Sequence, residues 1–529
     1  MLYPIGVQSF AEVIERENVY VDKTHLMHKL ISQGKYYFLS RPRRFGKSLL
    51  ISTMEAYFSG RKELFNGLAI DGVEAEWKEY PVLHFDLNAK KFDALEDLYD
   101  LIGRQLERYE DKYETEAVDK SLDGRFYNLI MTIAEATGNQ VVILVDEYDK
   151  PLLQTIGNVD IQNVYREALK AFYGVIKSCD SQIRFAFLTG VTKFGKISVF
   201  SDLNNLDDIS MDPAYYDICG ISEKELNEYF DAEIGKLAEE NELTKEQTYD
   251  RLRNEYDGYH FCENVFGIYN PFSVLSTLRK KRFGNYWFET GTPTYLVELL
   301  KRSDFPLDKI DGYKTGKDVL NGIDPDSPIA MIYQSGYVTI KDYDSEFDLV
   351  TVGFPNKEVE RGFLLFLLPF YTNLKKEDSN FFVSRAVLAL KNGDAKVFMS
   401  YMKSLLAGYP YDLIKDTENH YQNVIYLTLK LMSVYLVDAE FRTSDGRIDI
   451  LVRTDKFIYV MEFKYNGSAQ EAMDQIESKD YPLPFAMDPR TIVKVGVNFS
   501  GDTRNIDDCI IKTVPANSDP SSGPIQEPF

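Results

Sequence analysis

Residues 36–50 read YYFLSRPRRFGKSLL, and this stretch decides the fold of the front of the chain. It predicts a short buried strand, a tight basic loop and a helix that begins near Lys47, which is the layout of a phosphate-binding loop. Backbone N–H groups at the start of such a helix point at an anion, the lysine reaches the outer phosphates, and the serine hydroxyl binds Mg2+. The residues predicted to bind a nucleotide here are Arg43, Arg44, Phe45, Gly46, Lys47 and Ser48, and Ser48 is also a predicted metal ligand.

Arg41 departs from the general pattern G-x-x-x-x-G-K-S, which has glycine at this position. Glycine reaches positive φ angles without steric cost, and arginine does not. The loop must therefore bend without that freedom at position 41.

Residues 141–149, which read VVILVDEYD, form the second element of the predicted nucleotide site. Five aliphatic residues in a row are typical of a central parallel strand that is covered on both faces. Acids at the carboxyl end of such a strand lie where open α/β sheets bind ligands. We expect Asp146 to hold Mg2+, directly or through water, and Glu147 to polarise the attacking water. The alternative is a buried strand followed by a solvated acidic turn, and the loop at 41–48 favours the nucleotide site.

Two further strands are predicted at residues 81–87 and 184–190, and helical segments separate them from the first two. Strands that alternate with helical crossovers predict a parallel sheet with helices on both faces. Thr189 then falls at the carboxyl end of a strand, where it could sense the γ-phosphate or the catalytic water. A plain strand-end threonine is the alternative.

Composition limits the class of protein. The 529 residues carry a net charge of −23, which argues against a protein that coats nucleic acid through its whole surface but permits a local basic groove. The four cysteines form no C-x-x-C pair, so neither a zinc site nor a disulfide framework is expected. With no signal-peptide pattern and no apolar run of 18 residues, we expect a soluble cytoplasmic protein without a membrane partner.

A chain of this length predicts several domains. We expect an α/β nucleotide-binding domain over residues 1–203 and a mostly helical extension or lid, without a catalytic constellation, over residues 204–405. A C-terminal α/β domain is expected over residues 406–515. The tail at residues 516–529, rich in Ser, Pro and Gly, should be disordered.

A second predicted chemical site lies in a hairpin formed by residues 447–453 and 457–464. If the turn centres on Asp455 and Lys456, Asp449 and Glu462 are opposite partners, with Cβ atoms roughly 5 Å apart. Lys464, two residues beyond Glu462, shares that face.

Carboxylates held this close repel each other unless a divalent cation lies between them, and hard oxygen ligands suit Mg2+. Asp449 and Glu462 are therefore predicted metal ligands, and Glu418 could supply a third acid. Lys464 could position or deprotonate a water for attack on phosphorus, and Gln475 could contact the metal's water or the scissile phosphate. The alternative is a surface cluster in which Lys464 neutralises the two acids.

The motif residues resemble two known families. Asp449 with Glu462-x-Lys464, followed by the stretch at 475–481, resembles the D…(D/E)-x-K signature of the PD-(D/E)XK nuclease superfamily. The front of the chain is similar to the predicted AAA-type ATPase-like family in residues 20–24, 41–48, 146–151 and 188–194, and Arg41 matches that family's own variant of the loop. In that family such an ATPase is commonly joined to a nuclease-like domain of this type. The resemblance implies ATP and Mg2+ as cofactors and DNA as a partner.

Three readings of the function remain open. The first is an ATPase that controls a Mg2+-dependent nuclease acting on DNA phosphodiester bonds. The second is a nucleotide-dependent switch or DNA-binding regulator whose nuclease-like domain is not catalytic. The third is a nuclease whose front domain binds ATP structurally and scarcely turns it over. The presence of the key chemical groups at both sites favours the first.

Overall fold

The computed structural model describes residues 1–115, 119–193, 199–200, 203, 205–263, 265–288, 294–303, 305–322, 328–372, 374–407, 418–433, 438–444, 447–503, 505–514 and 525–527. The chain divides into two compact units. Unit 1 comprises Met1–Leu299 and Asp311–Val359, and unit 2 comprises Leu300–Ile310 and Glu360–Phe529.

The front of unit 1 is a five-stranded sheet in the order β2-β3-β4-β1-β5. Its strands are β1 (Tyr36–Ser40), β2 (Val82–Asp86), β3 (Val141–Asp146), β4 (Ile183–Gly190) and β5 (Asp207–Asp208). All of the paired strands run parallel. Every residue of β1 and β3 is buried, because helices cover both faces. The predicted parallel sheet is confirmed.

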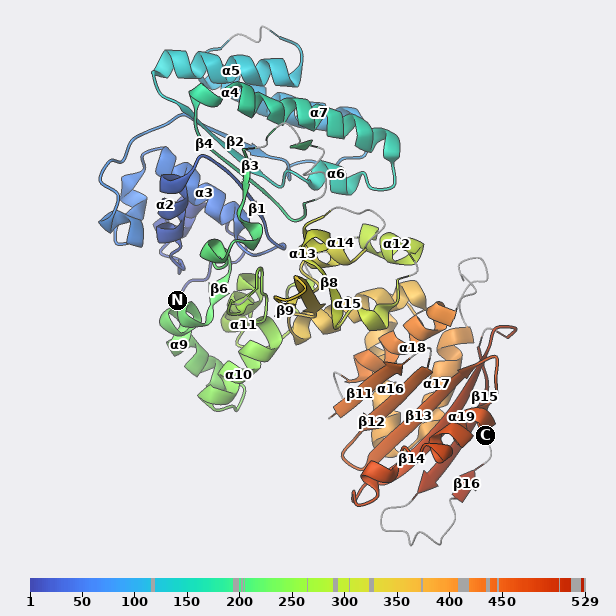
Figure 1. The fold of residues 1–529 in the computed structure, drawn as a ribbon. Coiled ribbons are helices and arrows are strands. Elements are labelled where there is room, and N and C mark those ends of the chain that lie inside the picture. Colours follow the sequence, from blue (N-terminus) through green and yellow to red (C-terminus); the bar gives the residue numbers. More distant parts are fainter. Residues whose placement is uncertain are drawn as a thin grey trace. The chain divides into compact units, whose positions relative to one another are not determined.

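Helices lie on the two faces of this sheet (Figure 1). The helices of this part are α1 (Phe10–Glu15), α2 (Thr24–Gln33), α3 (Lys47–Phe58), α4 (Glu96–Lys112), α5 (Leu122–Thr137), α6 (Lys150–Gln154) and α7 (Val159–Ser178). On one face, Phe126 of α5 stacks on Phe172 of α7 with ring centroids 4.4 Å apart. On the other face, Phe58 of α3 packs against Phe185 of β4 at 5.3 Å. Helices pack on both faces and hold the sheet, and the predicted site lies at the carboxyl edge of that sheet.

The rest of unit 1 is mostly helical. Its elements are β6 (Ile221–Ser222), α9 (Glu223–Glu240), α10 (Lys245–Tyr256), β7 (Ile268–Tyr269), α11 (Pro271–Lys280), α12 (Thr294–Ser303), which ends in unit 2, β8 (Tyr313–Gly316), α13 (Lys317–Asn321), α14 (Pro328–Gln334), β9 (Thr339–Asp344) and β10 (Leu349–Gly353). Helix α9 begins where Ser222 and Glu225 form a capping box, which satisfies two backbone N–H groups at the helix start. The small sheet has the order β8-β10-β9. We call the unit 1 residues 209–299 and 311–359 the middle region.

Unit 2 contains a six-stranded mixed sheet in the order β11-β12-β13-β14-β15-β16. Its strands are β11 (Asp438–Ser444), β12 (Arg447–Arg453), β13 (Phe457–Tyr465), β14 (Thr491–Ser500), β15 (Asn505–Val514) and β16 (Ile525–Glu527). Its helices are α15 (Lys357–Tyr371), which begins in unit 1, α16 (Lys376–Asn392), α17 (Ala395–Ala407), α18 (Glu418–Ser433) and α19 (Ala469–Ser478). The β13–β14 pair is parallel and the other pairs are antiparallel. The expected C-terminal α/β domain is therefore present.

The two faces of β13 meet different helices, α19 on one side and α16 on the other (Figure 1). Ile458 and Val460 join Met473 and Ile476 of α19 in an apolar cluster. Tyr459, between them in sequence, points the other way and donates its hydroxyl to the carbonyl of Leu390 in α16 at 2.7 Å. Even-numbered positions of β13 therefore face α19.

The predicted disordered tail is partly ordered. Residues 525–527 form β16, which pairs with β15, so the prediction was wrong for these three residues because a free strand edge was available to them. The other tail residues from 516 lie outside the described ranges.

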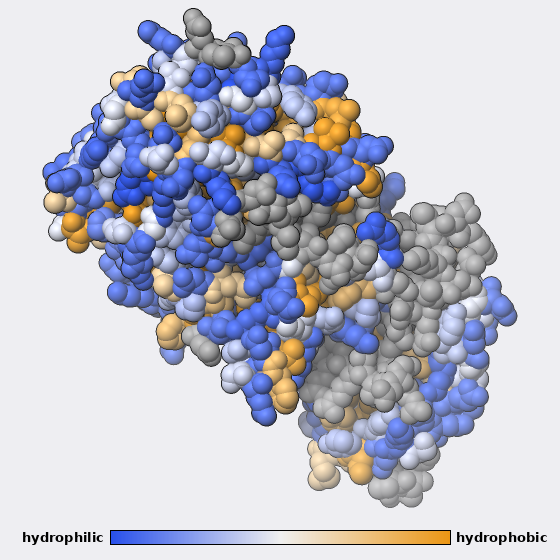
Figure 2. Space-filling view, turned by 45° about the horizontal axis from the view of Figure 1, so that its top comes forward, coloured by the Kyte–Doolittle hydropathy of each residue, from blue (hydrophilic) through white to orange (hydrophobic). Residues whose placement is uncertain are grey.

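The described residues on the face seen in Figure 2 are mostly hydrophilic. Figure 2 shows apolar patches scattered among polar residues on the face in view, as expected for a chain with 27% charged residues. Among the described helices, none is both long and apolar enough to cross a membrane.

Candidate active sites

The loop between β1 and α3 turns with two positive φ angles. Arg44 has φ 68° and Gly46, the N-cap of α3, has φ 97°. Gly46 adopts this conformation freely, whereas an arginine pays about 1 kcal/mol for it. The chain therefore makes the bend at positions 44 and 46, which explains how position 41 can be an arginine.

Lys47 lies inside the concavity of this loop. Its side chain is buried, and Nζ donates to the carbonyls of Arg41 at 3.0 Å and Pro42 at 3.3 Å. The same Nζ is 3.7 Å from Glu147 Oε1. The ammonium group is thus held at the centre of the loop, between its carbonyls and the acid that follows β3.

Two of the predicted residues, Ser48 and Thr189, donate to Asp146, which is the last residue of β3. One carboxylate oxygen accepts from Ser48 Oγ at 2.5 Å, and the other accepts from Thr189 Oγ1 at 2.8 Å. A carboxylate next to a serine hydroxyl is a hard oxygen donor set that fits Mg2+. Thr189 is completely buried, and its hydroxyl donates to Asp146. Direct contact between this hydroxyl and a phosphate or a water stays a prediction.

The sequence pattern predicts no role for Asp149, which belongs to the acidic stretch at residues 146–149. It is completely buried and accepts from the backbone N–H and the hydroxyl of Thr192, both at 2.7 Å. Burial, together with the nearby charge of Glu147, raises the pKa of Asp149 to about 6. Asp149 thereby ties the turn after β3 to the turn after β4.

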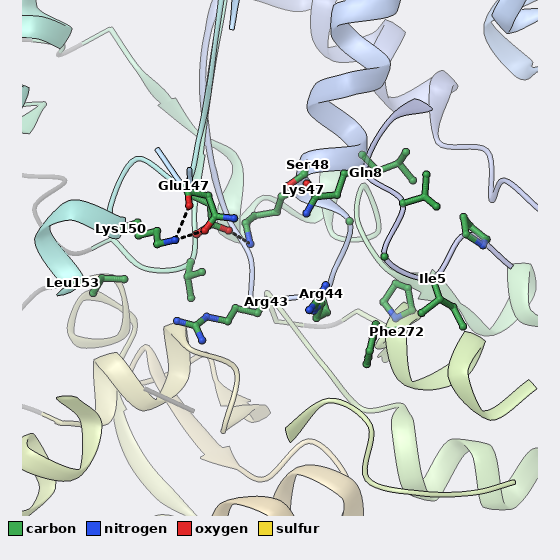
Figure 3. A pocket seen from close by; sticks show the side chains of 18 of the residues that line it. Ile5, Gln8, Arg43, Arg44, Lys47, Ser48, Glu147, Lys150, Leu153 and Phe272 are labelled. Atoms are coloured by element: carbon green, nitrogen blue, oxygen red, sulfur yellow. Dashed lines mark hydrogen bonds and ion pairs between the residues drawn. The ribbon is translucent and has the colours of Figure 1, made fainter. Parts of the chain in front are cut away.

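These elements enclose one pocket of about 760 Å3 (Figure 3). Of the predicted residues, those that line it are Arg43, Arg44, Gly46, Lys47, Ser48 and Glu147. Lys150 and Leu153 lie at one end of it, and Ile5, Gln8 and Phe272 lie at the other (Figure 3). Asp146, Thr189 and Phe45 are not among the lining residues.

Phe45 turns away from this pocket and into the middle region. Its ring packs edge-on against Tyr259 at 4.8 Å and Phe261 at 5.3 Å. Its contribution to binding is therefore limited to its backbone, and its side chain anchors the loop.

Arg41 is a buried support for the same loop. Its guanidinium donates to the carbonyls of Ser210 at 2.7 Å and Tyr215 at 3.3 Å, and it lies 4.1 Å over the ring of Phe261. Burial lowers the pKa of Arg41. At the position where the general pattern has glycine, the arginine thus joins the loop to the middle region.

Trp287 and Gly336 hold the neighbouring loop residues. Trp287 Nε1 donates to the carbonyl of Arg43 at 3.1 Å. At Gly336, where φ is 86°, an added Cβ would lie 2.6 Å from Pro42. The sequence predicted an extension without strong motifs here, and the structure shows that this region braces the loop.

Glu358 in turn holds Trp287. Its carboxylate accepts from the Trp287 backbone N–H at 2.9 Å and from Ser273 Oγ at 2.6 Å. Glu358 is almost fully buried, and burial raises its pKa to about 7. It stands at the start of α15, the helix in which the chain leaves unit 1.

The second candidate site lies on the α19 face of the unit 2 sheet. Asp449 and Glu462 are direct register partners, as the hairpin arithmetic predicts. Leu451, two residues after Asp449, packs against the cluster beneath α19, so alternation assigns position 449 to the same face. The side chains of Asp449 and Glu418 lie outside the described part of the chain.

The described side chains of this site form a connected set. Lys464 Nζ donates to Glu462 Oε1 at 3.0 Å and to Gln475 Oε1 at 2.5 Å. Glu462 is completely buried, and Lys464 is partly exposed. Among the described residues, no three acidic, histidine or cysteine side chains gather in a metal-binding group. A buried carboxylate beside a lysine still fits a hard cation, with position 449 opposite.

Comparisons with known proteins cover both sites. Residues 4–200 match a family described as predicted AAA-ATPase, and residues 416–509 match the PD-(D/E)XK nuclease superfamily. The chain is also 33% identical over 528 residues to a protein of Azotobacter chroococcum mcd 1, described as an uncharacterized protein in the vnfD 5' region. That match covers 97% of this chain and 99% of the relative.

Proposed function

The chain belongs to the predicted AAA-ATPase-like family and carries a C-terminal PD-(D/E)XK nuclease superfamily domain, and from this premise we propose an ATPase that controls a Mg2+-dependent nuclease acting on DNA in the cytoplasm. One observation supports the proposed ATPase activity most directly. Lys47 and Ser48 at the start of α3 line one pocket with Glu147, and Ser48 donates to Asp146 at the end of β3.

In this proposal each group of the pocket has one role. Lys47 holds the outer phosphates, and Ser48 with Asp146 would hold Mg2+, which neutralises phosphate charge. Glu147 accepts a hydrogen bond from the attacking water and orients it toward the γ-phosphorus. Thr189 keeps the Asp146 carboxylate turned toward Ser48. The pocket continues past the loop to residues 4–8 and Phe272, which leaves room for the nucleoside.

In the nuclease half, Asp449 and Glu462, with Glu418 as a possible third acid, would hold Mg2+. A bound cation activates water and stabilises the negative charge that develops at phosphorus. Lys464, held between Glu462 and Gln475, positions or deprotonates the attacking water, and Gln475 contacts the scissile phosphate.

The test of the ATPase half is turnover of ATP by the full chain and by Lys47→Ala. We expect wild-type hydrolysis that Lys47→Ala lowers by at least about 10²-fold, because the charge at the centre of the loop is lost. Lys62→Ala, an exposed lysine after α3, is the matched control and should leave turnover unchanged. A Lys47→Ala protein with wild-type turnover would rule out this site.

The test of the nuclease half is cleavage of DNA with Mg2+ or Mn2+, with and without ATP. Asp449→Ala and Lys464→Ala should each abolish cleavage, and Lys456→Ala in the hairpin turn should not. Cleavage that survives both site variants would come from another site.

A regulator with a non-catalytic nuclease-like domain is the second candidate. The observation that favours it is that the Lys464 ammonium already binds Glu462 and Gln475, so that the lysine could serve structure alone. DNA binding that responds to ATP, without cleavage in either metal, would decide for this candidate. Cleavage without ATP turnover would indicate a nuclease that binds ATP structurally.

A further inference from the structure

The three arginines of the phosphate-binding loop have different environments. The guanidinium of Arg41 is buried and donates to the backbone carbonyls of Ser210 and Tyr215. The guanidinium of Arg44 lies 4.9 Å over the ring of Phe272, at the end of the pocket near Ile5. Arg43 extends toward the opposite end, where Lys150 and Leu153 lie (Figure 3).

Lys150 faces Arg43 across that end of the pocket. It stands at the start of α6, and its Nζ donates to the carbonyl of Asn88 at 2.9 Å and to the Asn88 side chain. Burial lowers the pKa of Lys150, the carboxylates of Glu147 and Asp86 raise it in part, and the like charge of Arg43 lowers it. The two cations are thus close enough to repel each other.

Positive charge is in excess among the residues that line this pocket. Lys47 lies 3.7 Å from the carboxylate of Glu147, and Arg43 and Lys150 line the same pocket. Lys91 and Asp93, which also line the pocket, pair with each other at 2.5 Å. The lining of the pocket carries more cations than acids, since Arg43, Lys47 and Lys150 lie there with Glu147, and this favours a multiply charged anion. The carboxylates of Asp86 and Asp149 act on Lys150 and Glu147 from outside the lining.

We propose that Arg43 and Lys150 form the subsite for the terminal phosphoryl group of the bound nucleotide, and that Arg43 stabilises the transition state of its hydrolysis from within the same chain. The inference rests on the proposed ATPase function. It adds the residues that act on the γ-phosphate and removes the need for a second copy of the chain to supply an arginine.

The step balances without a further reactant. Water attacks the γ-phosphorus, the bond from that phosphorus to the β–γ bridging oxygen breaks, and the bridging oxygen leaves on ADP. Glu147 takes the proton of the water and returns it to the released phosphate. Arg43 and Lys150 offset the negative charge that spreads over the γ-phosphoryl oxygens during the step.

The experiment measures nucleotide affinity and turnover separately in the full chain. Arg43→Ala should lower kcat for ATP by at least about 10²-fold, while the Kd of a fluorescent ATP analogue changes by less than about fivefold. Arg43→Lys should recover only part of kcat, because lysine lacks the planar fork that grips two phosphate oxygens. Lys150→Gln should lower kcat by at least about tenfold, because it removes a charge that offsets the γ-phosphoryl oxygens.

Arg104→Ala, an exposed arginine of α4 outside this pocket, is the control and should match the wild type. Wild-type turnover per chain should also stay constant on hundredfold dilution. Unchanged kcat in Arg43→Ala, an equal loss of affinity and kcat, or turnover that vanishes on dilution would each overturn this inference. A wild-type protein that binds ATP without hydrolysing it would instead refute the proposed ATPase.

Discussion

The two candidate sites are built in opposite ways. In the nucleotide site, Arg43 is held by Trp287, 244 positions away along the chain. In the carboxylate–lysine site, Lys464 binds residues only 2 and 11 positions away. The first site therefore depends on long-range packing, whereas the second depends on one hairpin and the helix that follows it.

This difference has a consequence for stability. A local site needs only strand alternation and register to bring its groups together. The phosphate-binding loop, with a positive φ at a non-glycine residue, persists only because surrounding residues hold it there. We therefore expect substitutions in the middle region to damage the nucleotide site, and substitutions between α19 and its sheet to damage the other.

The largest expected effect is that of Arg41→Ala. It removes hydrogen bonds to two buried carbonyls and the packing on Phe261, and should destabilise unit 1 by about 4 kcal/mol. Chemical unfolding followed in the presence and absence of ATP measures this. The control Arg16→Ala, a surface arginine, should stay within about 0.5 kcal/mol. A loss below about 1 kcal/mol would mean that the loop does not depend on the middle region.

The second-largest expected effect is a pH dependence of stability caused by Glu358. Its folded-state pKa of about 7 lies above the ordinary 4.5, so the folded chain binds more protons than the unfolded chain between these values. The contribution of Glu358 to the free energy of unfolding is thus fully present below pH 4.5. It is lost as the pH rises from 4.5 to 7, by about 3 kcal/mol in total.

Glu358→Gln should remove this fall, so that the variant is less sensitive to pH than the wild type. The free energy of unfolding at pH 5 and pH 8 tests the difference, with the exposed Glu346→Gln as the control. Equal pH slopes for Glu358→Gln and the wild type would contradict the assignment.

Gly496→Ala tests the second site. An added Cβ would lie 2.6 Å from the Ala469 carbonyl and 3.0 Å from the Met473 nitrogen, so α19 must move off the sheet. We expect about 2 kcal/mol of destabilisation of unit 2, and weaker DNA cleavage as Gln475 shifts. Gly174→Ala in α7, where the new methyl group meets nothing within 4 Å, should not destabilise the chain. A Gly496→Ala protein of wild-type stability would mean that α19 is not tightly packed.

Trp287→Phe gives the smallest effect. It removes the single hydrogen bond to the Arg43 carbonyl while keeping an aromatic ring, and should cost about 1 kcal/mol, or about fivefold in ATP affinity. Trp77→Phe is the matched control, because the Trp77 indole N–H is buried with no hydrogen-bond acceptor among the described residues. If both variants bind ATP equally well, the brace on Arg43 is unimportant.

The sequence by itself determined both motif sets and the sheet that carries the first. Five aliphatic residues followed by Asp146 predict a buried parallel strand with an acid at its carboxyl end, and the structure has that strand as β3. The pairing of Asp449 with Glu462 follows from counting outward from the turn, because the side-chain period of a strand is fixed at two.

Only the tertiary structure decided what surrounds these groups. No periodic pattern in the sequence predicts the different environments of Arg41, Arg43 and Arg44. The same is true of the burial of Asp149 and of the contacts that Trp287 and Glu358 make behind the loop. The physical reason is that alternation and helical period act over a few residues, whereas these contacts join segments separated by tens to hundreds of positions. Such contacts arise only when buried polar groups must find partners in the finished core.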